Sequence, residues 1–126
     1  MSLWIDELVS TLPAQSIRQS PEDLQIYGRD WTVHHTPAPS IVVLPASVEE
    51  VQVVMRIAHQ HQVPVVPSGG RTGLSGGAVA ANGEIVIALD RMNKIIDFNQ
   101  VDRQIRVQAG VVTQAIQAFA QQKALF

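Results

Sequence analysis

The chain has 126 residues, of which 46% are hydrophobic and 16% charged, so it fits one ordinary globular domain and is not a disordered segment. The formal net charge of −2 and the lack of a basic stripe exclude a nucleic-acid-binding protein, because nothing is available to neutralise a phosphate backbone. Without cysteine there is no disulfide framework or thiolate metal site, and without a long apolar run no membrane span is expected, so we predict a cytoplasmic or membrane-peripheral protein.

The first part of the chain contains one predicted helix and then irregular chain. Apolar residues recur at helical spacing over residues 2–12, which indicates a short amphipathic helix that ends at Pro13. The residues that define its apolar face are Trp4, Leu8 and Leu12. Residues 16–39 are mixed in character and punctuated by prolines, so we predict irregular surface chain there.

A strand–helix–strand unit comes next. Residues 41–44 are wholly apolar, as in a strand that is buried on both faces of a parallel sheet. Ser47 and Glu50 have the spacing of a capping box, so a helix is predicted to begin there and to run to about His61. Its buried face is predicted to comprise Val51, Val54, Met55 and Ala58. Residues 63–66 form the next predicted strand, reached by a right-handed crossover.

A glycine-rich loop from about Pro67 to Gly83 follows this strand, and five of the chain's eight glycines lie within residues 67–78. Glycine permits positive φ and a close approach of ligand to backbone, and successive N–H groups can then surround an anion. The Ser68, Thr72 and Ser75 hydroxyls and the Arg71 guanidinium also suit phosphate oxygens. The candidate phosphate-binding residues are therefore Pro67, Ser68, Gly69, Gly70, Arg71, Thr72, Gly73, Leu74, Ser75, Gly76 and Gly77.

Two common phosphate-binding loops do not fit this segment. A Walker-type loop requires a lysine, and residues 67–83 contain none. The dinucleotide-binding fingerprint requires two glycines separated by a single other residue (G-x-G) at the start of a helix, and no such pair occurs here. The chain between Gly77 and the next strand is also too short for a crossover helix. A mobile surface loop without a ligand remains the alternative to a phosphate site.

The last part of the chain changes from a parallel to an antiparallel pattern. After a turn at Asn82–Gly83, residues 85–89 form a third apolar strand. Residues 95–98 and 104–107 alternate like the strands of an antiparallel hairpin, and residues 113–122 form a helix. One face of that helix is predicted to comprise Ala115, Ile116, Phe119 and Ala120. The predicted fold is α+β, with a small parallel sheet flanked by helices (β-α-β-glycine loop-β) before the start of an antiparallel-sheet subdomain.

Histidine pairs do not indicate a metal site. His34 and His35 are adjacent, so in extended chain their side chains point in opposite directions. His59 and His61 are two residues apart, which places them about 200° apart around a helix. Neither pair can share a ligand, and we predict no metal.

The ordered motifs resemble a known family. Residues 67–78, the apolar strand 85–89 and the run Arg91-Met92-Asn93-Lys94-Ile95 are similar to the FAD-binding (PCMH-type) domain of the vanillyl-alcohol-oxidase superfamily. Within it, the chain most resembles the group of the glycolate oxidase FAD subunit, D-lactate dehydrogenase and D-2-hydroxyglutarate dehydrogenase. The resemblance implies that residues 1–126 are the N-terminal part of one FAD-binding domain, and that the remainder of this domain and a separate substrate domain lie beyond it.

This resemblance also implies roles for the candidate residues. Residues 69–77 would surround the FAD diphosphate through backbone N–H groups, and Pro45 and Gly110 would line the adenosine end. Arg71 stands where some members carry a histidine bonded to the flavin, so FAD is predicted to bind non-covalently. Many nearer members have glycine there, so Arg71 is expected to pair either with phosphate or with a nearby carboxylate. No catalytic residue is assigned, and the substrate-binding groups are expected elsewhere.

The implied function is the FAD-binding portion of an oxidoreductase that removes hydride from a 2-hydroxy acid, such as D-lactate or glycolate, and passes electrons to an acceptor. Two alternatives remain open: other FAD chemistry, as in an alcohol oxidase or a non-redox synthase, and a non-catalytic nucleotide-binding module. We expect weak FAD binding by this chain alone. We also expect that an exposed sheet edge favours a homodimer.

Overall fold

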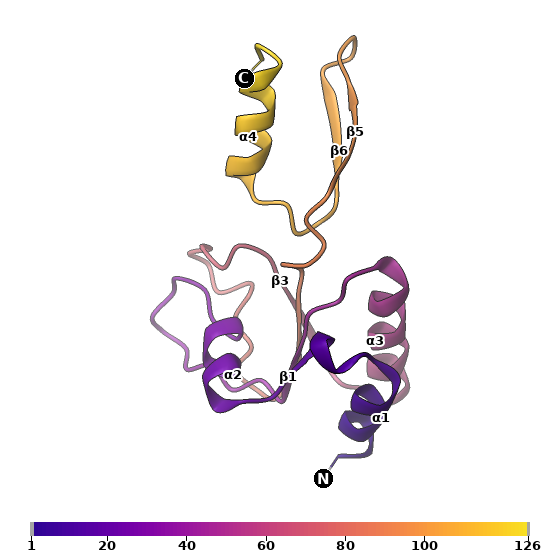
Figure 1. Ribbon diagram of the computed structural model, residues 1–126. Coiled ribbons are helices and arrows are strands. Elements are labelled where there is room, and N and C mark those ends of the chain that lie inside the picture. Colours follow the sequence, from indigo (N-terminus) through magenta and orange to yellow (C-terminus); the bar gives the residue numbers. More distant parts are fainter. Residues whose placement is uncertain (1, 126) are drawn as a thin grey trace.

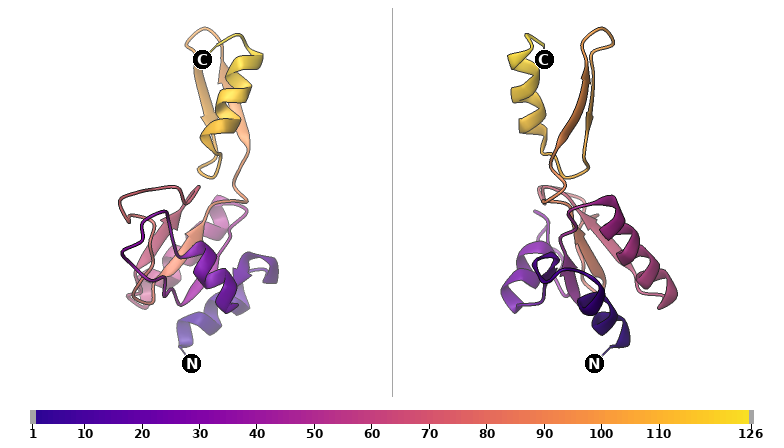
Figure 2. Two further views of the ribbon diagram at one scale, coloured as in Figure 1. Left: turned by 90° about the vertical axis from the view of Figure 1, so that its left-hand side faces the viewer. Right: turned by 45° about the vertical axis from the view of Figure 1, so that its right-hand side comes forward.

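The computed structural model describes residues 2–125 as a layered body with a helix and a hairpin projecting from one edge (Figure 1). Helices α1 (Leu3–Thr11) and α3 (Val48–Gln60) cover one face of a four-stranded sheet, and α2 (Pro21–Tyr27) covers the other. A short 3-10 turn, η1 (Ala14–Ser16), follows α1. The β5–β6 hairpin and α4 (Thr113–Gln122) extend side by side from this body (Figure 2). The predicted α+β class and the division into two subdomains are confirmed.

The four-stranded sheet has the order β1-β2-β4-β3, with β1 (Ile17–Arg18), β2 (Ile41–Val43), β3 (Val65–Ser68) and β4 (Ile85–Ala88). Strand β1 pairs antiparallel with β2, whereas β2, β4 and β3 are parallel. The last strand of the group in sequence, β4, therefore lies between the two strands that α3 connects. Because these three strands are parallel, their carboxyl ends meet at one edge of the sheet.

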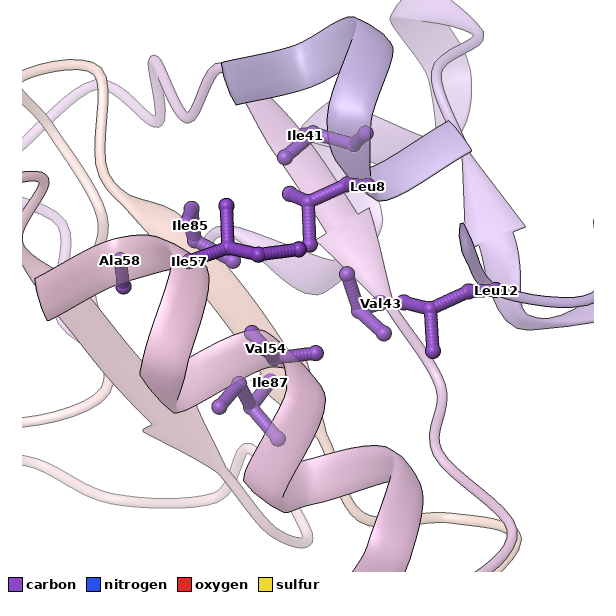
Figure 3. Close-up of a cluster of buried hydrophobic side chains, with 9 residues drawn as sticks. All are labelled: Leu8, Leu12, Ile41, Val43, Val54, Ile57, Ala58, Ile85 and Ile87. Carbon is purple, nitrogen blue, oxygen red and sulfur yellow. The ribbon is translucent and has the colours of Figure 1, made fainter. Parts of the chain in front are cut away.

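The core has two sides, one on each face of β2 and β4. Every residue of both strands is buried, as the wholly apolar sequences predicted. On one face, Leu8 of α1 and Val54 of α3 meet the inward side chains of the two strands (Figure 3). On the other face, Val42 and Val86 pack with Ala80, Leu24 and Tyr27. Alternate residues of β2 and β4 thus supply both core layers.

Helix α3 begins as predicted, and Val54 and Ala58 of its predicted face are buried. The Ser47 hydroxyl accepts a hydrogen bond from the N–H of Glu50 at 3.3 Å. The Glu50 carboxylate accepts from the N–H of Ala46 at 2.8 Å, one residue before the position that a capping box requires. The prediction was wrong for Met55, which is 46% exposed, while Ile57 is buried instead. Helix α3 therefore packs against the sheet through Val54, Ile57 and Ala58.

The prediction of irregular chain over residues 16–39 was also wrong in part. Strand β1 extends the sheet beyond β2, and α2 follows it. The start of α2 carries recognisable signals: the Ser20 hydroxyl accepts from the N–H of Asp23 at 3.1 Å, and Pro21 occupies the first turn. The proline that suggested a break therefore marks a helix start.

The projecting part consists of the β5 (Ile95–Asn99) and β6 (Gln104–Val107) hairpin with α4 beside it (Figure 2). The two strands pair antiparallel, as predicted. Phe98 and Phe119 meet edge to face with their ring centroids 5.3 Å apart, which joins hairpin to helix. No residue of α4 is buried, and Ala115, predicted to lie on its apolar face, is exposed.

Truncation of Leu8 is expected to lower the free energy of unfolding by about 2–5 kcal/mol, because this fully buried side chain links α1 to the sheet and its loss leaves a cavity. Val9 lies on the same helix but is 45% exposed, so Val9→Ala should change stability by no more than about 0.5 kcal/mol. Urea denaturation of Leu8→Ala and Val9→Ala measures both. Equal effects would contradict the packing of α1 against the sheet.

Candidate functional site

The glycine loop leaves the sheet at the carboxyl end of β3, beside the end of β4. Pro67 and Ser68, predicted to open the loop, are the last residues of β3, where they pair with Ile87 and Ala88. Residues 69–84 contain no helix or strand, which confirms the predicted connection without a crossover helix. At Gly83, φ is +83°, as the predicted turn requires.

The first part of the loop exposes bare backbone. A side chain added at Gly69 or Gly77 would meet no atom within 4 Å, and one at Gly70 would meet only the Thr72 hydroxyl at 4.0 Å. Among the glycines of residues 69–77, Gly76 alone has a positive φ, at +78°. Most of these glycines therefore leave space beside the chain and do not serve an unusual backbone conformation. Such space is what a backbone cradle for a ligand needs.

Asp30 anchors the far part of the loop. The residue is 6% exposed. Its carboxylate accepts hydrogen bonds from the N–H of Gly76 at 3.1 Å and from the N–H and hydroxyl of Thr32 at 2.7 and 2.6 Å. The N–H of Trp31 donates to the carbonyl of Gly73 at 3.0 Å. Hydrogen bonds from Thr32 and Gly76 hold the pKa of the Asp30 carboxyl below its ordinary value, against the opposite effect of burial.

Arg71 pairs with a carboxylate. Its two terminal nitrogens donate to the two carboxylate oxygens of Asp90, at 2.9 and 2.6 Å. One of these nitrogens also donates to the buried Ser68 hydroxyl at 3.3 Å, and the guanidinium lies 4.8 Å from the centroid of the Tyr27 ring. Asp90 raises the pKa of the Arg71 guanidinium. The sequence predicted phosphate or a nearby carboxylate as the partner of Arg71, and it did not identify Asp90 as that carboxylate.

The neighbour of Asp90 makes a second connection. Arg91 donates to the carbonyl of Leu44 at 2.9 Å and to the hydroxyl of Ser16 at 2.8 Å. The Ser16 hydroxyl in turn donates to the Glu50 carboxylate at 3.1 Å. Two adjacent residues after β4 thus contact both neighbours: Asp90 holds the chain after β3, and Arg91 holds the chain after β2.

Two adjacent hollows, of about 330 and 400 Å³, separate the glycine loop from the start of α4, and we call them the α4-side hollows. Gly69, Gly70 and Gly110 line both of them. The other residues that line one or both are Arg71, Thr72, Asp90, Asn93, Ala109, Val111, Val112, Thr113, Gln114 and Ala115. Many of these residues are glycine or have small side chains, and Arg71, Asn93 and Gln114 bring longer polar side chains to the lining.

The start of α4 contributes donors to the same place. Its first residues, Thr113 and Gln114, line one hollow, and the N-cap residue Val112 makes no side-chain cap. The first N–H groups of any helix lack partners within it, and the helix dipole favours negative charge beside them. The glycine loop and the start of α4 therefore lie on two sides of one hollow.

The remaining predicted site residues lie in different surroundings. Gly110 packs so closely that an added side chain would lie 1.7 Å from the carbonyl oxygen of Leu89. Ser68 and Pro45 are fully buried. Leu74 is 75% exposed, and Thr72 and Ser75 are exposed as well. The structure brings Gly69 to Thr72 together with Gly110, and direct ligand contact by Pro45 or Ser68 stays a prediction.

Residues 39–126 match the protein family described as FAD binding domain. The chain belongs to this family of FAD binding domains. The match contains every residue that lines the α4-side hollows, and the family's description names the cofactor predicted from the sequence. Open backbone at Gly69 and donors at the start of α4 fit the diphosphate of FAD.

Curated relatives match nearly the whole chain. Two proteins named D-2-hydroxyglutarate dehydrogenase are 50% identical over 122 residues, in Stutzerimonas stutzeri, and 55% identical over 118 residues, in Xanthomonas citri pv. viticola. These matches cover 97% and 94% of this chain and 26% and 25% of the relatives. Glycolate oxidase subunit GlcD of Escherichia coli K12 is 36% identical over 83% of this chain and 21% of that protein. The chain spans about a quarter of these relatives' length.

Solved structures share the fold at lower identity. A 4-ethylphenol oxidase from Gulosibacter chungangensis aligns with a TM-score of 0.83 over 96% of this chain and 24% of that protein, at 24% identity. An alkyldihydroxyacetonephosphate synthase aligns with a TM-score of 0.81 over 95% of this chain and 24% of that protein, at 19% identity. These similarities support the fold and do not extend to the reaction.

Residues 2–125 contain neither a cluster of metal ligands nor a membrane-spanning helix. Over this range, no three histidine or carboxylate side chains are grouped as a metal site requires. No helix described in this range has both the length and the apolar character needed to cross a membrane. The hollows beside the glycine loop are the candidate site, because Gly69, Gly70 and Gly110 of the predicted site line both of them.

Asp30 is expected to make stability depend on acid pH. Because its pKa is lower in the folded chain than in the unfolded chain, its contribution is fully present above the unfolded value, about 3.9, and is lost as the pH falls through the folded value. Urea unfolding at a series of pH values should show a steeper acid loss for wild type than for Asp30→Asn. Thr32→Val, which removes one donor, should reduce the loss, and equal slopes for wild type and Asp30→Asn would contradict the assignment.

Proposed function

We propose that this chain holds the diphosphate of FAD between the glycine loop and the start of α4, as the cofactor-binding part of a flavin-dependent oxidoreductase. The observation that carries the proposal is the pair of hollows lined by Gly69 and Gly70 on one side and by Val112 to Gln114 on the other. The N–H groups of these residues, with the Thr72 hydroxyl, would donate to phosphate oxygens. Gly69 lacks a side chain where one would enter the space.

Recognition of the diphosphate would rest on dipoles more than on a free cation. The positive charge of Arg71 is matched by Asp90, at 2.6 Å. Backbone N–H groups and the α4 dipole remain as the donors, and they suit an anion without requiring a basic surface. Arg71 offers no imidazole for a bond to the flavin, so we propose that FAD is bound non-covalently.

For the whole protein we propose oxidation of a 2-hydroxy acid, in which bound FAD accepts hydride and an electron acceptor reoxidises it. The two relatives at 50% and 55% identity, both named D-2-hydroxyglutarate dehydrogenase, favour a dicarboxylic 2-hydroxy acid over lactate or glycolate. No residue of this chain is proposed as the catalytic base. The cytoplasmic location, the electron acceptor and a dimer through an exposed sheet edge such as β3 remain predictions.

Other FAD chemistry on the same fold is the second candidate. The structural neighbours include an oxidase and a synthase by name, at 24% and 19% identity, so the fold does not choose between reactions. The test uses a protein that spans the full length of these relatives. Addition of D-2-hydroxyglutarate without oxygen is expected to abolish the visible absorption of oxidised FAD, and D-lactate and glycolate are tested for comparison. An oxidised spectrum with all three would contradict the proposed reaction.

Gly69→Val is expected to weaken FAD binding at least about tenfold, because it adds a side chain to a backbone that lines both α4-side hollows, while its Cβ meets no atom within 4 Å. The variant should therefore fold normally. Ala118→Val also creates a valine, at an exposed position of α4, and should bind FAD as wild type does. Calorimetric titration of FAD, with thermal unfolding as the folding control, measures the effect.

Two results of this titration would contradict the cradle. Gly69→Val could bind FAD with the wild-type dissociation constant, which would place the diphosphate elsewhere. The wild-type chain could also fail to bind FAD at millimolar concentration, which would leave the α4-side hollows without the predicted ligand.

A further inference from the structure

Arg71 has a backbone conformation that arginine rarely adopts. Its φ is +58°, in the left-handed region that favours glycine. It directly follows Gly69 and Gly70, which line the α4-side hollows. A residue that carries a side chain persists in this region only where its surroundings determine the conformation. The contacts of the Arg71 side chain are therefore part of what shapes the loop.

Three separate elements hold the side chain. Asp90, after β4, accepts two hydrogen bonds at 2.9 and 2.6 Å, and Ser68, at the end of β3, accepts one at 3.3 Å. Tyr27, at the end of α2, lies under the guanidinium at 4.8 Å. The side chains of Arg71 and Asp90 are 20% and 35% exposed, so their charges are shielded only in part by water. Two parallel hydrogen bonds fix the orientation as well as the distance.

Arg71 also separates two spaces. On one side lie the α4-side hollows, and on the other lies a hollow of about 460 Å³ beside α2. Gly70 and Arg71 line both sides. The residues that complete the α2-side hollow are Ile26, Arg29, Asp30, Trp31, Thr32 and Val33. A shift of Arg71 would therefore move the wall of the candidate FAD site.

We propose that Asp90 is a positioning residue for the diphosphate, acting through Arg71. By holding the guanidinium, Asp90 keeps Arg71 left-handed and aims the N–H groups of Gly69 to Thr72 into the α4-side hollows. Arg71 is then a wall of the site, and its positive charge is neutralised by Asp90. The phosphate is therefore bound by backbone N–H groups. This inference rests on the proposed FAD site and names the residue pair that sets its geometry.

The competing role for Arg71 is that of a direct phosphate ligand. Hydrogen bonds to Asp90 and Ser68 occupy both hydrogens of one terminal nitrogen and one hydrogen of the other. Two N–H donors remain, but the neighbouring carboxylate cancels the net charge. The two roles differ in their response to salt, because screening weakens binding that depends on a charged partner.

A double-mutant cycle distinguishes the roles. Calorimetric titration of FAD compares wild type, Asp90→Asn, Arg71→Gly and the double variant, with thermal unfolding as the folding control. Asp90→Asn should weaken binding about tenfold or more, whereas in the Arg71→Gly background it should have no further effect. Glycine tolerates the left-handed backbone, so Arg71→Gly should fold normally. FAD binding by the double variant, which lacks both charges of the pair, should be as sensitive to salt as that of wild type.

Three results would overturn the inference: wild-type affinity in Asp90→Asn, an equal loss from Asp90→Asn with and without Arg71, or a lower salt sensitivity in the double variant than in wild type. A measurement without cofactor separates failure of this inference from failure of the FAD proposal. Amide hydrogen exchange of residues 69–72 should be faster in Asp90→Asn than in wild type, and no faster in the double variant than in Arg71→Gly. Unchanged exchange in Asp90→Asn would overturn the inference whether or not FAD binds.

Discussion

The placement of β4 between β2 and β3 is the constraint on which the candidate site depends. Because all three strands are parallel, the residues after β4 lie between the ends of both neighbours. Asp90 reaches the loop after β3 through Arg71, and Arg91 reaches the end of β2 through Leu44. Two consecutive residues therefore fix the edge of the sheet from which the glycine loop emerges. Ligands of open parallel sheets commonly bind at such an edge.

The second half of the candidate site, Gly110 and the start of α4, lies beside the glycine loop because the chain leaves the sheet and returns to it. The β5–β6 hairpin closes where Lys94 and Met92 accept hydrogen bonds from Gln108 and Gly110, at 2.9 and 2.8 Å. Gly110 permits this closure, since any side chain there would overlap the backbone of Leu89. The closure directs the chain into α4, whose start then faces the glycine loop. An anion site assembled in this way draws its donors from backbone, which agrees with a chain of net charge −2.

Sequence patterns predicted what depends on local periodicity and missed what depends on partners. Residues 41–44 and 85–89 read as buried strands because both faces are apolar, and the glycine loop stood out by composition. Helix α2 was missed because Pro21 was taken as a break, although Ser20 before it marked a helix start. The strand order leaves no local trace, and the pairing of Arg71 with Asp90 follows from that order. Charged residues directly after buried parallel strands were the available signal.

A crystal structure of the protein with FAD would test the central claim most directly. The account predicts diphosphate oxygens within about 2.7–3.2 Å of N–H groups from Gly69 or Gly70 and from Thr113 or Gln114, with Arg71 still paired to Asp90. A diphosphate bound directly by the Arg71 guanidinium, with Asp90 released, would contradict the recognition by backbone. A diphosphate outside the α4-side hollows would contradict the site itself.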